Sequence, residues 1–212
     1  MIPRKLSLCD VGARGGLASP WNELMDFVRV MSFEPDAEEH ARLLAKQRVG
    51  DLCLPTALFS TKGEIEINLT KARGSSSIYK PNMKFLSQYP DAARFTVEKK
   101  ISVECDTLDH LTAAEKIPKI DFIKLDVQGA ELDILKGGKT ALASEAIAIE
   151  LEVEFSEMYI NQPLFADVDK FIREELNLQL VDLRKIYWKY ERGKNLGGPK
   201  GQLVFGDALY FK

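Results

Sequence analysis

The chain contains 212 residues, of which 45% are hydrophobic and 29% charged, a composition that suits one soluble domain with a sizeable core. A formal net charge of −3 gives no basic field for nucleic acid, and no apolar run reaches the ~20 residues of a membrane span. Three widely spaced cysteines favour reduced thiols in a cytoplasmic protein, and two histidines offer little material for a metal site. Residues 1–8 contain too few apolar residues for a signal peptide.

The first third of the chain predicts alternating strands and helices. In chain order we expect a strand at 5–11, a helix at 19–27, a strand at 28–33, a helix at 36–46 and a strand near 50–59. Ser19 suits a helix N-cap and Pro20 the first helical position. Asp36 and Glu39 have the spacing of a capping box.

The middle of the chain begins with strict alternation at 64–69, which predicts a half-exposed strand. Residues 70–94 carry turn residues, including three serines at 75–77, without a clear period. Long irregular segments in compact domains tend to be functional or mobile, so we expect an acceptor loop here. A strand at 95–103 and a short helix from 107–111 follow.

The block at 121–138 combines a short apolar strand, a turn at Gly129 and the start of a helix. Lys124 and Asp126 are two positions apart, so their side chains share one face of the strand. Carboxylates at the carboxyl end of a buried strand point into the crevice where open α/β sheets bind ligands. The block therefore predicts one wall of a binding site.

The last third predicts a strand at 146–155, a helix at 163–176, and two final strands at 178–188 and 202–211. No helix separates the final two strands, so we expect them to be antiparallel neighbours. Strand–helix alternation along the rest of the chain predicts an α/β fold, mainly a parallel sheet with helices on both faces. Without an internal repeat or linker, residues 1–212 are expected to form a single domain.

A glycine-containing loop at 10–16 follows the first strand and permits close approach of a ligand to the backbone. Glu34, at the end of the second strand, is placed to accept hydrogen bonds from both ribose hydroxyls. Asp10 would sit badly against a pyrophosphate but suits a cationic ligand, which favours S-adenosylmethionine over NAD. A tight strand–helix turn without any nucleoside is the alternative.

Four segments in this order resemble the FkbM family of S-adenosylmethionine-dependent methyltransferases. They are Asp10-Val-Gly-Ala-Arg-Gly-Gly16, Phe33-Glu-Pro-Asp36, Asp106-Thr-Leu-Asp109 and Asp121-Phe-Ile-Lys-Leu-Asp-Val-Gln-Gly-Ala-Glu131. The resemblance implies the class I methyltransferase (Rossmann-like) three-layer sandwich, with a seven-stranded sheet whose last strand is antiparallel. It also implies O-methylation of a hydroxyl on a sugar, a glycan or a small natural product.

Carried over by position, the resemblance assigns cofactor contacts along the chain. The methionine portion would be lined by Asp10, Gly12, Arg14 and Gly16. The ribose would be held by Glu34 beside Pro35, and the adenine flanked by the segment from Ala57 to Ser60. Asp126 and Gln128 would face the methyl group and the acceptor.

Two residues depart from the family pattern, which usually has asparagine at Arg14 and glutamate at Gln128. An amide at 128 weakens the expectation that this position acts as a base. The chain also begins almost directly on the first strand. Cover for the cofactor would then come from residues 70–94, 155–165 or 189–201, from a second copy of the chain or from a partner domain.

Methyl transfer to a hydroxyl requires positioning, exclusion of water and removal of one proton. Asp126 is the first candidate for the base, followed by Glu131 and Glu152. Each has a structural alternative: an ion pair between Lys124 and Asp126, a helix-dipole role for Glu131 and a solvated row for the glutamates of strand 146–155. An NAD(P)-linked oxidoreductase and a non-catalytic binding domain remain alternative functions.

Overall fold

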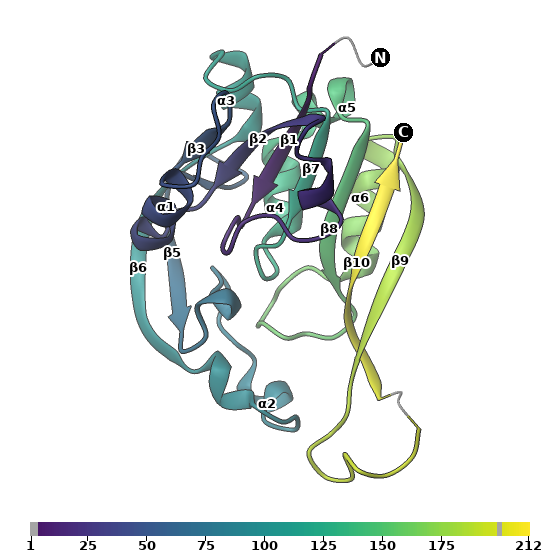
Figure 1. Cartoon of the computed structure of the whole chain (residues 1–212). Coiled ribbons are helices and arrows are strands. Elements are labelled where there is room, and N and C mark those ends of the chain that lie inside the picture. Colours follow the sequence, from purple (N-terminus) through teal and green to yellow (C-terminus); the bar gives the residue numbers. More distant parts are fainter. Residues whose placement is uncertain (1–3, 199–200) are drawn as a thin grey trace.

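The computed structural model describes residues 4–198 and 201–212. A seven-stranded sheet forms its centre, in the order β3-β2-β1-β7-β8-β10-β9. The strands are β1 (Leu6–Val11), β2 (Val28–Phe33), β3 (Leu52–Leu54), β7 (Phe122–Leu125), β8 (Ala148–Glu154), β9 (Gln179–Trp188) and β10 (Gln202–Phe211). Neighbouring strands from β3 to β8 are parallel. Only β10 is antiparallel to its neighbours β8 and β9, so the predicted class I methyltransferase topology is confirmed (Figure 1).

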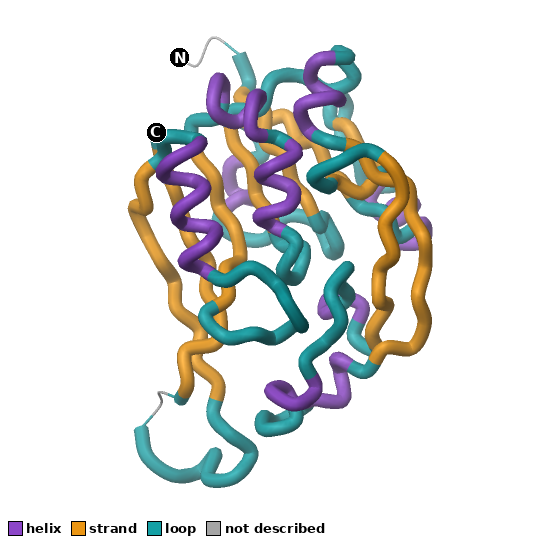
Figure 2. The backbone as a smooth tube through the Cα atoms, turned by 180° about the vertical axis from the view of Figure 1, so that it is seen from behind, coloured by secondary structure: helices purple, strands orange, loops and turns teal. Residues whose placement is uncertain are grey.

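Helices cover the two faces of this sheet unequally. Four helices, α3 (Leu108–Ala113), α4 (Glu131–Gly137), α5 (Lys139–Glu145) and α6 (Phe165–Glu175), lie behind it (Figure 2). They bury the largest apolar cluster, which includes Met31, Ile123 and Leu151. Within the described residues, the helical elements on the front face are α1 (Ala37–Leu44) and the short 3₁₀ turn η1 (Trp21–Leu24). The sheet is therefore accessible mainly from the front.

A second, three-stranded sheet stands beside the carboxyl edge of the first. It has the order β4-β6-β5, with β4 at Ala57–Leu58, β5 at Gly63–Thr70 and β6 at Val97–Asp106. The predicted strand near 50–59 is thus divided between two sheets, because β3 pairs with β2 and β4 pairs with β6. Pro55 lies at the break, where its missing N–H cannot continue a ladder.

Three further differences from the expected elements are local. The helix predicted at 19–27 is reduced to η1, and the segment at 70–94 contains η2 (Arg73–Ser75), α2 (Met83–Leu86) and η3 (Ala92–Phe95). The helix after Gly129 is two helices, α4 and α5, with Asp109 accepting from the backbone N–H groups of Thr140 and Ala141 at the start of α5. Across the described ranges, no helix has the length and apolar character needed to cross a membrane.

Side-chain alternation divides the front face of the sheet into rows. The uppermost row is apolar, with Leu8 and Val30 packed against Trp21. One pleat lower, the same strands and β7 present Asp10, Ser32 and Lys124, which are register partners. The polar rows lie toward the carboxyl edge, where the cavities described below are found.

Candidate active site

A cavity of about 220 Å³ opens at the carboxyl end of β1, β2 and β7, between the two sheets. Seven of the ten residues predicted to bind the cofactor line it: Gly12, Arg14, Glu34, Pro35, Ala57, Asp126 and Gln128. They come from four separate segments of the chain. The fold therefore brings together most of the residues that the sequence singled out.

The remaining three predicted cofactor residues do not line this cavity. Asp10 and Gly16 line a second cavity of about 190 Å³ on the front face, and Ser60 lines neither of these two. Asp10 is 2% exposed and its Oδ1 has no hydrogen-bond partner, although Lys124 Nζ lies 3.7 Å away. Burial raises the pKa of Asp10 to about 6.

An apolar wall, supplied mainly by the second sheet, closes the larger cavity. Ile65, Ile67 and Ile101 project into it, opposite Ile134 of α4. These residues were not singled out from the sequence, although the alternation at 64–69 places its isoleucines on one face. Their pairing with β6 could not be read from that pattern. The result is a cavity with one polar wall and one apolar wall.

The polar wall begins where β1 ends. Gly12 has φ of +75°, and a Cβ placed on it would lie 2.0 Å from the carbonyl oxygen of Asp126, so only glycine fits. Arg14 forms ion pairs with Asp36 at 3.1 Å and with Glu39 at 3.5 Å. Its guanidinium therefore bridges the glycine loop to α1.

Glu34 lies at the end of β2 and lines the same wall. Its Oε1 accepts a hydrogen bond from the backbone N–H of Asp36 at 2.9 Å. Burial raises the pKa of the Glu34 carboxyl. The second carboxylate oxygen stays available to accept a hydrogen bond from a ligand hydroxyl.

Gln128 is the centre of a hydrogen-bond network in the loop after β7. Its Nε2 donates to Asp126 Oδ1 at 2.9 Å and to Glu152 Oε1 at 2.9 Å. Its Oε1 accepts from the hydroxyl of Tyr159 at 3.0 Å, and Ser77 Oγ donates to its carbonyl oxygen at 2.7 Å. The residue has φ of +58°, a conformation that non-glycine residues adopt at a cost.

Glu131 is buried beneath this loop. Its two carboxylate oxygens accept from the backbone N–H groups of Val127 and Gly129, both at 2.9 Å. Burial raises the pKa of Glu131 to about 7. With both oxygens engaged by the main chain, this carboxyl is placed to hold the loop.

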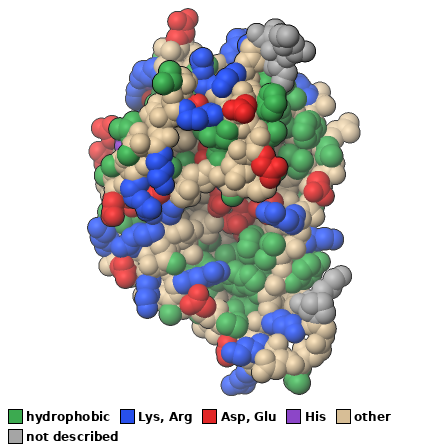
Figure 3. All heavy atoms as spheres, viewed as in Figure 1, with side chains coloured by type: hydrophobic (Ala, Val, Ile, Leu, Met, Phe, Trp, Pro, Cys, Tyr) green, Lys and Arg blue, Asp and Glu red, His purple; other side chains and the backbone are tan. Residues whose placement is uncertain are grey.

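Carboxylates gather in a hollow at the centre of the front face (Figure 3). Asp126 has 46% of its side chain exposed, with Lys124 Nζ 4.0 Å from its Oδ2, so this pair is not buried. Burial, reinforced by the charge of Asp126, raises the pKa of Glu152 well above its ordinary value. Glu154 is buried, and its burial likewise raises the pKa of its carboxyl. We call this group of Asp126, Glu152 and Glu154 the acidic hollow.

Neither histidine belongs to the cavity. His110 Nδ1 lies 2.8 Å from Asp106 Oδ1, and His40 contacts the carbonyl oxygen of Cys53. Within residues 4–198 and 201–212, no group of three or more His, Cys, Asp or Glu side chains is arranged to hold a metal ion.

Sequence comparisons find relatives that share this arrangement of segments. Residues 10–178 match the family model of the methyltransferase FkbM domain. The chain is also 31% identical over 185 residues to the 2-O-methyltransferase NoeI of Sinorhizobium fredii (strain NBRC 101917 / NGR234), covering 81% of this chain and 73% of NoeI. The match to the family domain includes the end of β1 and all of β2, β7 and β8, which carry the polar wall and the acidic hollow.

A solved methyltransferase structure shares the fold. The methyltransferase FkbM from Methylobacillus flagellatus KT aligns with a TM-score of 0.53 at 13% identity, covering 98% of this chain and 44% of that one. This chain therefore spans less than half the length of that protein. The magnesium protoporphyrin IX methyltransferase ChlM from Synechocystis PCC 6803, solved with bound S-adenosylmethionine, aligns at 0.47 and 12% identity, covering 99% of this chain and 71% of that one.

Proposed function

Because the chain belongs to the FkbM methyltransferase family, we propose that it transfers the methyl group of S-adenosylmethionine to a hydroxyl oxygen. The acceptor is a sugar, a glycan or a small natural product. One observation carries the proposal: the cavity joins an apolar wall to a polar wall that ends at a partly exposed carboxylate, Asp126. A nucleoside cofactor with a cationic centre needs this combination of surfaces.

The residues of the cavity suit the parts of this cofactor. Glu34 would accept hydrogen bonds from the ribose hydroxyls, as acidic residues at the end of a second strand do in related folds. Ile65, Ile67 and Ile101 offer an apolar surface to the adenine ring. Gly12 leaves room for a ligand close to the backbone. When bound, S-adenosylmethionine supplies an electrophilic methyl group on a positively charged sulfur.

Asp126 is the residue that we assign as the base for the acceptor hydroxyl. Its Oδ1 is held by Gln128 Nε2, while the partial exposure of the side chain leaves it accessible from the hollow. A carboxylate within hydrogen-bond reach of a hydroxyl can accept its proton as the oxygen attacks. The Gln128 contact orients this carboxylate before the acceptor arrives.

The two other candidates for the base are assigned different roles. Glu131 positions the loop through its bonds to Val127 and Gly129. Glu152 accepts from Gln128, and its raised pKa favours a protonated carboxyl that anchors the amide. Asp10 and Gly16 line the second cavity, where the Asp10 carboxylate faces Lys124.

The proposal is tested by isothermal titration calorimetry of the full chain with S-adenosylmethionine and, separately, with NAD. We expect saturable binding of the former, weakened in Glu34→Ala, and none of the latter. Turnover is then measured on a panel of hydroxylated acceptors with a labelled methyl donor. NAD binding alone would indicate an oxidoreductase, and binding of the methyl donor without turnover on any acceptor would indicate a non-catalytic domain.

A further inference from the structure

Arg94, in η3, has an unusual environment for a half-buried arginine. Its guanidinium carbon lies 4.7 Å from the ring centroid of Phe95 and 5.2 Å from that of Trp188. Its Nε is buried and has no hydrogen-bond partner. Among the residues that the structure describes, no carboxylate forms an ion pair with it.

The other half-buried arginines of the described chain are all paired. Arg14 pairs with Asp36, Arg48 with Asp51 and Arg73 with Glu98. Arg94 differs because aromatic rings contact its guanidinium while its side-chain N–H groups have no acceptor in the described part of the chain. Stacking on rings fixes the plane of a guanidinium but leaves its N–H edge free for a bidentate oxyanion.

Arg94 lies on the acceptor side of the site. The ring of Phe95 packs against Tyr159 at a centroid distance of 6.1 Å, and the Tyr159 hydroxyl binds Gln128 Oε1. Burial raises the pKa of Tyr159, and the charge of Arg94 opposes that rise. The guanidinium is therefore within electrostatic range of the network that holds Asp126.

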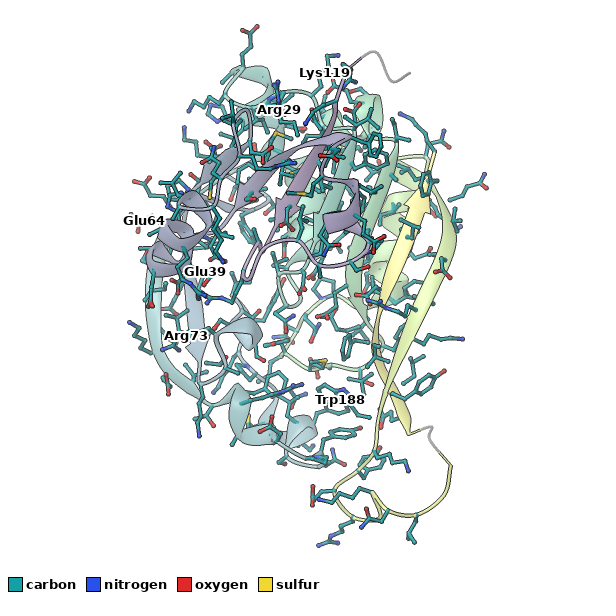
Figure 4. All side chains as sticks on the ribbon, in the orientation of Figure 1. Arg29, Glu39, Glu64, Arg73, Lys119 and Trp188 are labelled. Atoms are coloured by element: carbon teal, nitrogen blue, oxygen red, sulfur yellow. The ribbon has the colours of Figure 1, made fainter. Side chains whose placement is uncertain are left out.

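The front face directly below the acidic hollow is apolar. Figure 3 shows hydrophobic side chains directly below the carboxylates on the front face. In Figure 4, Trp188 lies in this region, between the C-terminal hairpin and the segment that contains α2. The guanidinium of Arg94 contacts the rings of Phe95 and Trp188. Phe95 in turn packs against Tyr159, which binds Gln128, the residue that holds the candidate base.

We propose that Arg94 forms an oxyanion subsite, which binds a carboxylate, sulfate or phosphate group carried by the acceptor. The identification of the ligand as an acceptor rests on the proposed methyl transfer. Phe95 and Trp188 hold the guanidinium in place before binding. The acceptor then spans from the base at Asp126 to the anion at Arg94, and a neutral analogue lacks the second attachment.

The binding step is tested with inorganic sulfate, phosphate and acetate on the full chain, at constant ionic strength set with chloride. Tryptophan fluorescence is the readout, because Trp188 contacts Arg94 directly. We expect saturable binding that Arg94→Gln weakens about tenfold or more, since charge-assisted hydrogen bonds are lost. Arg94→Lys keeps the positive charge but lacks the planar guanidinium. Its affinity for the anions is expected to lie between those of the wild type and Arg94→Gln.

The matched control is Arg192→Gln, which makes the same change of charge at an exposed arginine in the C-terminal hairpin. It should bind sulfate as the wild type does. Equal binding by Arg94→Gln and the wild type would overturn the subsite, as would the lack of saturable binding of all three anions by the wild type.

The source of the anion is tested by steady-state inhibition. Sulfate should inhibit methylation competitively against an anionic acceptor and lose this effect in Arg94→Gln. Inhibition that is not competitive would overturn the assignment to the acceptor. Calorimetry with S-adenosylmethionine separates the two proposals. Arg94→Gln should bind this methyl donor normally. If the wild type binds sulfate through Arg94 but does not bind S-adenosylmethionine, only the proposed methyl transfer is refuted.

Discussion

Gly12 and Asp126 meet where β1 and β7 end side by side, and a Cβ on Gly12 would lie 2.0 Å from the Asp126 carbonyl oxygen. Gly12→Ala must therefore move one of the two segments that form the polar wall. We expect the free energy of unfolding to fall by more than about 2 kcal/mol and binding of S-adenosylmethionine to be lost. Chemical denaturation and calorimetry measure the two effects.

Gly15→Ala is the matched control for this change. Gly15 also has a positive φ, of +82°, but a Cβ there would meet nothing within 4 Å. Gly15→Ala should lower the free energy of unfolding only by the roughly 1–2 kcal/mol that a left-handed conformation costs alanine, and the variant should still bind the cofactor. If the two variants behave alike, the contact between Gly12 and Asp126 does not shape the site.

Asp126→Asn tests the proposed base. Asparagine has the same size as aspartate, and the side chain at position 126 is partly exposed. The substitution should therefore leave the protein folded, so that a loss of rate reports on catalysis. We expect turnover to fall by about 10²–10⁴-fold, the usual contribution of general base catalysis. Single-turnover kinetics with a competent acceptor measure the rate, and calorimetry shows that the cofactor still binds. Asp182→Asn, on the outer strand β9, should leave both the turnover rate and cofactor binding unchanged. Full activity of Asp126→Asn would show that Asp126 is not the base and that β7 has only a structural role.

A pH-dependent loss of stability is expected from Asp10. Its ordinary pKa of 3.8 rises to about 6 in the folded state because the carboxyl is buried. Below pH 3.8 both states hold the proton; as the pH rises, the unfolded chain releases it first, so the free energy of unfolding falls until about pH 6 and then levels off. The contribution is on the order of 2–3 kcal/mol.

Urea denaturation of the wild type and Asp10→Asn between pH 4 and pH 7 measures this contribution. The difference between the two proteins isolates Asp10, because both retain every other titrating group. The wild type should lose stability relative to Asp10→Asn across the interval. Parallel curves would show that Lys124, 3.7 Å away, compensates fully for the burial of the carboxylate.

Much of the main sheet was predictable because its strands are short apolar runs with clear boundaries. The strand predicted at 28–33 is β2 at Val28–Phe33, and the last two strands are antiparallel as predicted. The second sheet was not predictable. β5 and β6 pair across the whole segment between Thr70 and Val97, and no local pattern specifies a partner that far along the chain.

The site shows the same division between local and long-range information. Glu34 and Asp126 were found because strand ends carry ligand-binding carboxylates, and both line the cavity. Tyr159 was missed because its bond to Gln128 joins residues 31 positions apart. Asp10 was expected in the cavity, but alternation along β1 turns its side chain to the front face, toward Lys124. Ser77, in a triplet that suggested a flexible turn, is 2% exposed and bonded to Gln128.

Gln128→Glu restores the residue usual in the family, yet we expect it to impair this protein. The amide donates to Asp126 and to Glu152, and an ionised glutamate can donate to neither. Loss of these bonds should lower the free energy of unfolding at pH 7 by about 1–3 kcal/mol and reduce turnover. Both defects should lessen at lower pH, where a protonated carboxyl at 128 can donate again. Gln88→Glu, at the surface, is the control; a Gln128→Glu protein as active as the wild type would show that the amide is not needed to orient Asp126.

Asn68→Ala should loosen the segment that closes the cavity opposite the polar wall. Asn68 is 5% exposed, and its Nδ2 lies 3.2, 3.1 and 3.2 Å from the carbonyl oxygens of Ser77, Ile78 and Tyr79. Ser77 and Ile78 line the cavity. Without Asn68 Nδ2, the part-buried carbonyl oxygens of Ile78 and Tyr79 lose this donor, whereas the Ser77 carbonyl keeps its bond from the Asn68 backbone N–H. We expect the free energy of unfolding to fall by about 1–3 kcal/mol and the affinity for S-adenosylmethionine to fall with it, as measured by denaturation and calorimetry. Asn22→Ala, at an exposed position of η1, should change neither. An Asn68→Ala protein that binds the cofactor normally would mean that residues 77–79 keep their place without this contact.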